Sequence, residues 1–180
     1  MRILKESTAG LVIDIQERLY PHIHEHEAVA RNTGILVEGL RVLGVPVLVT
    51  QQYTRGLGPT IPGLRDLIKG YPLIEKTAFS CCDEPEFIRA LGQTHKPFIL
   101  IAGIESHVCV LQTVIDLVER GYQPVLLEDC VSSRKASDKS TAVRRMQKEG
   151  AVVSSYESIL FELCRHSGTD EFRSISKLVK

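Results

Sequence analysis

Residues 98–113 read Phe-Ile-Leu-Ile-Ala-Gly-Ile-Glu-Ser-His-Val-Cys-Val-Leu-Gln-Thr, and this stretch decides the fold. Its apolar run over 98–102 lies between Pro97 and Gly103, which is typical of a strand buried on both faces. Ser106 is a suitable N-cap, because a serine hydroxyl can accept a hydrogen bond from a free N–H of the first helical turn. The stretch therefore predicts a strand, a turn and a helix, with Cys109 in the first turn of that helix.

Cys109 has the placement of a reactive thiol. At the start of a helix, the unpaired amides and the positive end of the helix dipole favour the thiolate over the thiol. A strand–turn–helix unit that presents a thiol in this way is suited to nucleophilic catalysis. We therefore expect other parts of the chain to supply a base and a positive charge close to Cys109.

Composition places the chain among ordinary globular proteins. Its 180 residues are enough for one domain, which we expect to span 1–180, and 43% of them are hydrophobic. Lysine plus arginine and aspartate plus glutamate number 22 each, so we expect neither a nucleic acid nor a membrane as partner. The five cysteines include no Cys-x-x-Cys pair and we find no signal peptide, so a cytoplasmic location with reduced thiols is expected.

Short apolar runs alternate with helical patterns along the chain. We predict strands over 10–15, 45–50, 72–76, 98–102, 123–128 and 151–153. Helices are predicted over 25–43, 84–91, 107–120, 137–148, 156–164 and 170–180. The third of these helices is apolar nearly all round, so we expect it to be deeply buried. Residues 51–63 are rich in glycine and proline, which indicates a loop that forms a lid over the site. The alternation predicts an α/β fold with a parallel sheet between two layers of helices.

Three residues of reactive type follow or end predicted strands. Asp14 lies near the carboxyl end of the first strand, Lys76 ends the third, and Cys109 comes after the fourth. In a parallel sheet these ends share one edge, and ligands bind there at the point where the strand order reverses. Each residue alone has an ordinary explanation: the aspartate as a loop cap, the lysine in solvent, the cysteine in the core. Together they predict a site in which Asp14 is the base, Lys76 stabilises the anions and Cys109 is the nucleophile.

His107 is a second candidate base for Cys109. The two residues are two positions apart, and such positions point away from each other on a helix, so we expect His107 to face a neighbouring element instead. His22, His24 and His26 have a spacing that permits a zinc site. The glutamates between them favour a solvated surface.

The other four cysteines are interpreted as small buried hydrophobic residues. Cys81 and Cys82 are adjacent in sequence, whereas Cys130 and Cys164 stand alone. None of these spacings is that of a metal site or of a Cys-x-x-Cys redox pair. Either Cys81 or Cys82 is a candidate for the wall of a pocket above Cys109.

Four segments, in this order, resemble the isochorismatase-like cysteine hydrolase superfamily. They are Leu-Val-Ile-Asp-Ile-Gln at 11–16, Glu-Lys-Thr-Ala-Phe-Ser at 75–80, Gly-Ile-Glu-Ser-His-Val-Cys-Val at 103–110 and Asp-Cys-Val-Ser-Ser-Arg at 129–134. Each segment alone is a weak signal, but together they are specific and cover nearly the whole chain. The loop Gln-Tyr-x-x-Gly-Leu-Gly-Pro-Thr and the closing segment 172–179 are most similar to the isochorismatase-domain-containing subgroup.

The resemblance implies a fold and a set of site residues. The family fold is a Rossmann-like three-layer α-β-α sandwich around a six-stranded parallel sheet of order 3-2-1-4-5-6. Its Asp–Lys–Cys triad falls on Asp14, Lys76 and Cys109, the residues that the strand placement also selects. The family has a non-proline cis peptide before its nucleophile, which corresponds to the Ile104–Glu105 bond. The backbone N–H groups of Glu105 and Cys109 would then form an oxyanion hole.

Departures from related subfamilies narrow the expected chemistry. Nicotinamidases carry an Asp-x-His metal site after the second strand, where this chain has Gln51-Gln52-Tyr53. We therefore expect no catalytic zinc and no cofactor, and nicotinamide is disfavoured as the substrate. True isochorismatases cleave a vinyl ether without the cysteine, so Cys109 argues against that activity.

The leading hypothesis is a metal-independent hydrolase of a small amide or related acyl compound, acting through a thioester on Cys109. Gln16, Tyr53 and Phe79 are candidates for the substrate-binding wall. Two alternatives stay open: an ether or ester hydrolase with the same triad, and a binding or scaffold protein that keeps the fold without turnover. Because relatives commonly form dimers or larger assemblies, we expect a homo-oligomer.

Overall fold

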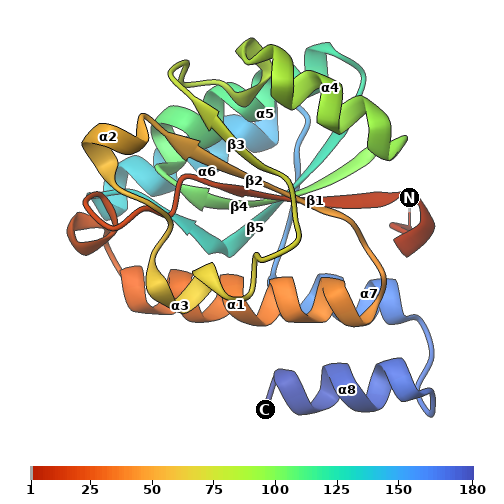
Figure 1. Cartoon of the computed structure of the whole chain (residues 1–180). Helices are drawn as coiled ribbons and strands as arrows, with labels where there is room; N and C mark the ends of the chain where they lie inside the picture. Colours follow the sequence, from red (N-terminus) through yellow and green to blue (C-terminus); the bar gives the residue numbers. More distant parts are fainter. Residues whose placement is uncertain (1) are drawn as a thin grey trace.

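The computed structural model describes residues 2–180 and contains a six-stranded sheet of order β3-β2-β1-β4-β5-β6 (Figure 1). Every neighbouring pair of strands is parallel. The α/β class and the strand order expected from the sequence and its resemblance are thereby confirmed. The strands are β1 (Thr8–Ile13), β2 (Val47–Gln52), β3 (Leu73–Lys76), β4 (Phe98–Ile104), β5 (Gln123–Ser132) and β6 (Val152–Ser154).

Helices cover both faces of the sheet. They are α1 (His26–Val42), α2 (Thr54–Leu57), α3 (Pro62–Arg65), α4 (Pro85–Thr94), α5 (Leu111–Glu119), α6 (Ala136–Lys148), α7 (Tyr156–Cys164) and α8 (Asp170–Leu178). Helices α4, α5 and α6 pack on one face, and α1 and α7 pack on the other (Figure 1). Helix α8 lies outside α1 and packs against it, which adds a helix beyond the three layers.

Two hydrophobic cores lie on opposite faces of the sheet, because alternate residues of a strand point to opposite faces. On β4, Ile99 and Ile101 belong to the core beneath α4, α5 and α6, whereas Leu100 and Ala102 belong to the core beneath α1, α7 and α8. Strands β1 and β4 are buried along their whole length. This double burial is why the run over 98–102 is apolar at every position and not only at every second one.

Three features differ from the sequence prediction. Strand β2 continues to Gln52 and is followed by the short helices α2 and α3, so residues 51–63 do not form a single loop. Strand β5 is paired with β4 as far as Ser132, and it therefore includes Asp129, which the sequence predicts to follow the strand. Helix α5 is only partly buried, because Gln112 and Glu119 are exposed to solvent.

The carboxyl ends of β1 and β4 meet where the strand order reverses. The chain continues from β1 to β2 on one side, and from β4 to β5 on the other. The two strands pack closely here, since Gly103 pairs with Ile13 and a Cβ atom at position 103 would collide with the Ile13 backbone. Residues that follow β1 and β4 therefore lie on either side of one crevice, the usual ligand position in an open parallel sheet.

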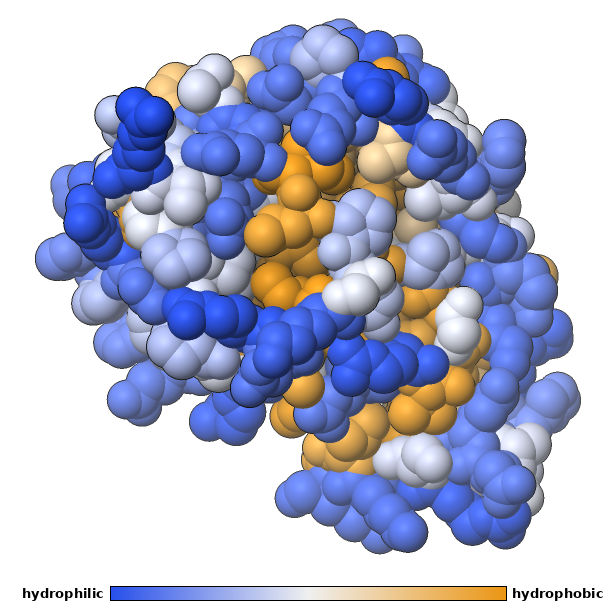
Figure 2. All heavy atoms as spheres, in the orientation of Figure 1, coloured by the Kyte–Doolittle hydropathy of each residue, from blue (hydrophilic) through white to orange (hydrophobic). Residues whose placement is uncertain are grey.

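The surface seen in this orientation is mostly hydrophilic, with hydrophobic residues gathered in a hollow near its centre (Figure 2). Exposed large hydrophobic side chains include Leu73 on β3 and Val152 on β6, the two edge strands of the sheet. Both edges of the sheet thus carry an exposed apolar side chain. No helix among residues 2–180 is both long enough and apolar enough to cross a membrane.

Candidate active site

The structure brings Asp14, Lys76 and Cys109 together at the carboxyl edge of the sheet. Asp14 directly follows β1, Lys76 is the last residue of β3, and Cys109 lies in a π-helical turn, Ser106–Val110, that follows β4. Lys76 Nζ lies 2.7 Å from Asp14 Oδ2, and neither side chain is exposed to solvent. The charges of both groups affect the pKa of the Cys109 thiol. Three residues from distant parts of the chain therefore form one buried cluster.

Lys76 is surrounded by oxygen acceptors. Besides its ion pair with Asp14, its ammonium donates to Gln52 Oε1 at 2.6 Å and to the carbonyl oxygens of Phe79 at 3.1 Å and Ala78 at 3.2 Å. Burial acts to lower the pKa of Lys76. The Asp14 charge and the nearby Cys81 and Cys109 together outweigh the effect of burial, so the pKa of Lys76 is raised overall. Lys76 is thus held as a fixed positive charge beside Asp14.

Asp14 is held in an unusual backbone conformation. Its φ is +52°, a region that residues other than glycine rarely adopt. Its N–H donates to the carbonyl oxygen of Thr50 at 3.2 Å, and its Oδ1 accepts from the Thr50 hydroxyl at 2.7 Å. The other oxygen, Oδ2, contacts Lys76 as an ion pair outside the angular range of a directed hydrogen bond. Asp14 Oδ2 therefore remains the less constrained oxygen of the carboxylate.

Cys109 differs from the sequence prediction in its protonation. Burial, followed by the nearby Asp14 charge, raises the pKa of Cys109 to about 12, although Lys76 acts to lower it. The thiol is only 7% exposed, and loss of solvation disfavours the thiolate more than the helix start favours it. The resting group is therefore a thiol, and its activation requires a neighbouring base.

Ser106 is not the N-cap that the sequence predicts. Glu105 occupies the residue before the turn, and the Ser106 hydroxyl is buried without a hydrogen-bond partner among the described residues. The Val110 N–H donates to the carbonyl oxygen of Glu105, five residues back, which is the π-helical pattern. The wider turn accounts for the failure of a capping rule that assumes a regular α-helical start.

Stability is expected to fall above pH 9. Burial raises the pKa of Cys81 to about 11 and those of Cys82 and Cys109 to about 12, from an ordinary value of 9.0. Their contribution to stability is complete below the unfolded-state pKa and is lost as the pH rises through the folded-state pKa. Each thiol should lower the free energy of unfolding by about 1.4 kcal/mol per pH unit in that window.

Urea denaturation of the wild type and of Cys82→Ala across the alkaline range tests this slope. Other alkaline titrations are common to both proteins, so the difference between the two slopes isolates one thiol. The variant should have the shallower slope. Equal slopes would show that the Cys82 thiol ionises as readily in the folded as in the unfolded chain.

A pocket of about 290 Å³ opens onto this cluster. Asp14 and Cys109 lie in its lining together with three other polar residues, and the remaining four lining residues are apolar. Of the three predicted wall residues only Phe79, which is 55% exposed, lines it. The full lining consists of Asp14, Leu19, Gln52, Leu57, Phe79, Glu105, Val108, Cys109 and Arg134.

Gln16 and Tyr53 do not line this pocket. The Gln16 side chain is fully buried and bonds to the backbone of Gln52 and to the carbonyl oxygen of Gly58, so it fixes the segment that leads into α2. Tyr53 lies outside the pocket and is 52% exposed. Leu57, from the same segment, reaches the pocket instead. Leu57 reaches the pocket because of the path that helix α2 takes, and no sequence pattern indicated that helix.

Glu105 and Arg134 form one side of the pocket. The Ile104–Glu105 peptide bond is cis. Glu105 Oε1 accepts from the Arg134 Nε at 3.0 Å and from the Arg134 backbone N–H at 3.2 Å. The Glu105 carboxylate is thus engaged by Arg134, and its backbone borders the pocket next to Cys109. Arg134 lies in a segment that the resemblance had singled out, but only the fold brings it to the pocket.

His107 does not pair with Cys109. Its Nδ1 lies 2.9 Å from the Ser133 hydroxyl, at the end of the adjacent strand, as the helical geometry predicts. His22 and His24 are exposed and His26 is half-buried. Among residues 2–180, no group of three or more histidine, cysteine or acidic side chains is arranged to hold a metal ion.

The two glutamines that end β2 have structural partners. Gln51 Oε1 accepts from both the N–H and the hydroxyl of Thr60, and Gln52 Oε1 accepts from Lys76. Cys81 and Cys82 are buried and do not line the pocket. The Cys81 thiol instead donates to the Thr50 hydroxyl, with a distance of 3.9 Å between Cys81 Sγ and Thr50 Oγ1.

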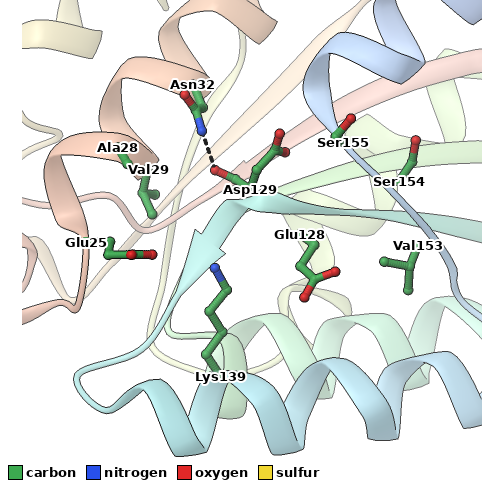
Figure 3. Close-up of a pocket in the computed structure, with 10 residues that line it drawn as sticks. All are labelled: Glu25, Ala28, Val29, Asn32, Glu128, Asp129, Lys139, Val153, Ser154 and Ser155. Atoms are coloured by element: carbon green, nitrogen blue, oxygen red, sulfur yellow. Dashed lines mark hydrogen bonds between the residues drawn. The ribbon is translucent and has the colours of Figure 1, made fainter.

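A larger pocket of about 480 Å³ lies elsewhere, between α1, the ends of β5 and β6, and α6 (Figure 3). Figure 3 shows Glu25 and Lys139 pointing into it, with Asn32 bonded to the Asp129 carbonyl oxygen. The Asp129 carboxylate accepts the Tyr156 N–H at the start of α7, which gives it a capping role. This pocket has no cysteine in its lining. The candidate active site is therefore the smaller pocket, which contains Cys109.

Comparisons with known proteins identify the family and agree with the fold. The model of the isochorismatase domain matches residues 8–158. Isochorismatase family protein 1B of Dictyostelium discoideum is 37% identical over 99% of this chain and 89% of its own length. A Caenorhabditis elegans structure described as MAR1 ribonuclease is 34% identical, with a TM-score of 0.94 over 99% of this chain and 92% of that one.

A further structure shares the fold alone. The Escherichia coli YcaC gene product, described as an octameric hydrolase of unknown specificity, is 24% identical, with a TM-score of 0.93 over 99% of this chain and 89% of its own. The family model spans more than half of the chain, and the Dictyostelium relative aligns along nearly its whole length. The chain therefore belongs to the isochorismatase family and has its hydrolase fold.

Proposed function

We propose that the chain is a metal-independent cysteine hydrolase that cleaves a small amide or related acyl compound. The observation that carries the proposal is the buried cluster of Asp14, Lys76 and Cys109 at the floor of a small pocket. A thiol with a pKa of about 12 needs a base in contact with it, and Asp14 is the carboxylate that affects it most. Acyl transfer through cysteine is the chemistry that this combination serves.

The proposed reaction has two halves. Asp14 takes the proton of Cys109 as the sulfur attacks the substrate carbonyl carbon and forms a tetrahedral intermediate. Asp14 then gives that proton to the leaving nitrogen, the C–N bond breaks, and the acyl group remains on Cys109 as a thioester. Water, deprotonated by Asp14, attacks the thioester and releases the acid, and the proton returns to the Cys109 sulfur.

Two other groups support these steps electrostatically. Lys76 keeps a positive charge beside Asp14 throughout, which stabilises the carboxylate and then the sulfur anion. The backbone N–H groups of Glu105 and Cys109 are the proposed donors to the oxyanion, and both residues border the pocket. The pocket volume of about 290 Å³ favours a small substrate, and the apolar wall of Leu19, Leu57 and Val108 favours an apolar group next to the carbonyl.

Other functions make different predictions for the same residues. An ether or ester hydrolase with the same triad differs only in its leaving group. Cleavage of RNA is a candidate because the C. elegans relative is described as a ribonuclease. It is disfavoured by the zero formal net charge of the chain and by the small pocket. A scaffold protein without turnover would have no use for a charged pair buried beside a thiol.

Mass spectrometry with a panel of small amides, esters and an RNA oligonucleotide tests the proposal. The wild type should release product and Cys109→Ala should lose at least about 1,000-fold in turnover, because the acyl acceptor is gone. Cys109→Ser, with its weaker nucleophile, is the matched control for the size of the side chain. It should also be strongly impaired, and an acyl adduct should map to residue 109. Undiminished turnover by Cys109→Ala would overturn the mechanism.

A homo-oligomer and a cytoplasmic location remain predictions. The first is supported by the octameric state described for the YcaC gene product. Exposed apolar side chains at both edges of the sheet are available for such contacts. The proposed partner in the pocket is a small-molecule substrate.

A further inference from the structure

We infer that Thr50 is a positioning residue that orients the Asp14 carboxylate toward Cys109. The inference rests on the proposed function, in which Asp14 accepts the proton of Cys109. Thr50 is fully buried on β2, directly beside the end of β1. It does not line the pocket, so it acts through Asp14 and not on the substrate.

Thr50 holds Asp14 at two points. Its carbonyl oxygen accepts from the Asp14 N–H at 3.2 Å, and its hydroxyl donates to Asp14 Oδ1 at 2.7 Å. The backbone contact fixes where residue 14 lies, in a conformation with φ of +52° that few side chains adopt. The hydroxyl contact fixes how the carboxylate plane is turned. With Oδ1 engaged by Thr50, Oδ2 is left for Lys76 and for proton exchange with Cys109.

The charge of Asp14 and a hydrogen bond from Cys81 together fix the direction in which the Thr50 hydroxyl donates its proton. An ionised carboxylate only accepts hydrogen bonds, so Thr50 must donate its single hydroxyl proton to Asp14. The Cys81 thiol donates to Thr50 Oγ1 at a sulfur–oxygen distance of 3.9 Å. Cys81 is itself held, because its backbone N–H donates to the Thr113 hydroxyl at 2.9 Å. Thr113 belongs to α5, the helix that continues from the Cys109 turn.

This arrangement links the base to the element that carries the nucleophile. The connection runs from α5 through Thr113, Cys81 and Thr50 to Asp14, entirely within the buried core. A valine at position 50 would keep the shape of the side chain and the backbone contact, and would remove the donor to Oδ1 together with the acceptor for the Cys81 thiol. The carboxylate would then have a buried oxygen without its donor and would turn away from its present direction.

The experiment measures how fast iodoacetamide alkylates Cys109, with the modified residue identified by peptide mass spectrometry. Because the Asp14 charge raises the pKa of Cys109, a carboxylate that turns away should leave more thiolate. Thr50→Val should therefore speed alkylation at neutral pH, by about tenfold for each unit by which the pKa of Cys109 falls. Thr50→Ser keeps the hydroxyl and should react within about twofold of the wild type. Thr33→Val, which removes the hydroxyl of another buried threonine on α1, should leave the rate unchanged.

Asp14→Asn separates failure of this inference from failure of the proposed function. If Asp14→Asn is faster than the wild type while Thr50→Val reacts like the wild type, the role of Thr50 is refuted and the proposed function stands. If Asp14→Asn itself reacts like the wild type, Asp14 is not the base and the proposed function fails. Thermal denaturation followed by circular dichroism verifies folding. Should Thr50→Val not fold, Thr50→Ala takes its place, and alkylation of Thr50→Ser as fast as that of the valine or alanine variant would refute the inference by itself.

Discussion

Replacement of Lys76 with methionine is expected to lower the free energy of unfolding by about 3–5 kcal/mol and to abolish turnover. Methionine has a similar length and fits the same space, so the loss is one of charge and not of packing. Asp14 would be left as an unpaired anion with no exposed surface, and Gln52 Oε1 would lose its donor. Urea denaturation and the amide panel measure the two effects.

Two further variants show that the effect comes from the buried pair. Asp14→Asn combined with Lys76→Met removes both charges and should recover part of the stability while activity stays absent. Lys5→Met breaks an ion pair with Glu171 of comparable distance, 2.7 Å, but both of its side chains are about one-third exposed. It should cost no more than about 1 kcal/mol. Wild-type stability in Lys76→Met would show that the pair is not needed to balance charge in the core.

Replacement of Gly103 with alanine is expected to destabilise the protein by more than about 4 kcal/mol or to prevent folding. The added Cβ would collide with the Ile13 carbonyl oxygen and lie 2.6 Å from the Ile13 nitrogen. These are backbone atoms of the central strand, which cannot rotate away. Gly103 also has φ of +135°, which alanine rarely adopts.

Gly92→Ala is the matched control for the glycine substitution. Gly92 lies in helix α4, and a Cβ there would meet no atom within 4 Å. It should stabilise the protein by about 0.5–1 kcal/mol, because alanine has the higher helix propensity. Far-UV circular dichroism and urea denaturation compare the two variants. A loss below about 1 kcal/mol in Gly103→Ala would mean that β1 and β4 can separate at this point.

The strand–helix alternation was predictable because it rests on local patterns. Burial on both faces makes the residues of β1 and β4 mostly apolar, and a short window around either strand contains that signal. The predicted ends of strands were less accurate where pairing with a neighbouring strand sets them. Strand β5, for example, continues to Ser132 because it pairs with β4 up to that residue. The strand order came from the resemblance to a family, since no local pattern specifies which strands are neighbours.

The candidate site was predictable where it depends on strand ends. Asp14, Lys76 and Cys109 were found because residues at the carboxyl ends of parallel strands share an edge. Gln16 does not line the pocket, because its side chain bonds to the backbone of the segment that leads into α2, a contact between residues distant in sequence. Tyr53 also lies outside the pocket and is exposed to solvent. Arg134 was missed as a pocket residue, because its approach to Glu105 needs β5 to pair beyond its apolar residues.

The sequence by itself determined the layered α/β fold, the places of Asp14, Lys76 and Cys109 at or after strand ends, and the absence of an Asp-x-His pair at 51–53. Only the tertiary structure decided the protonation of Cys109, because burial and the charge of Asp14, neither of which is local in sequence, raise its pKa to about 12. It also decided the orientation of Asp14, since Thr50 and Lys76 reach it from two other strands. Reactivity at this site therefore depends on long-range contacts, whereas the positions of its residues follow from the periodicity of the chain.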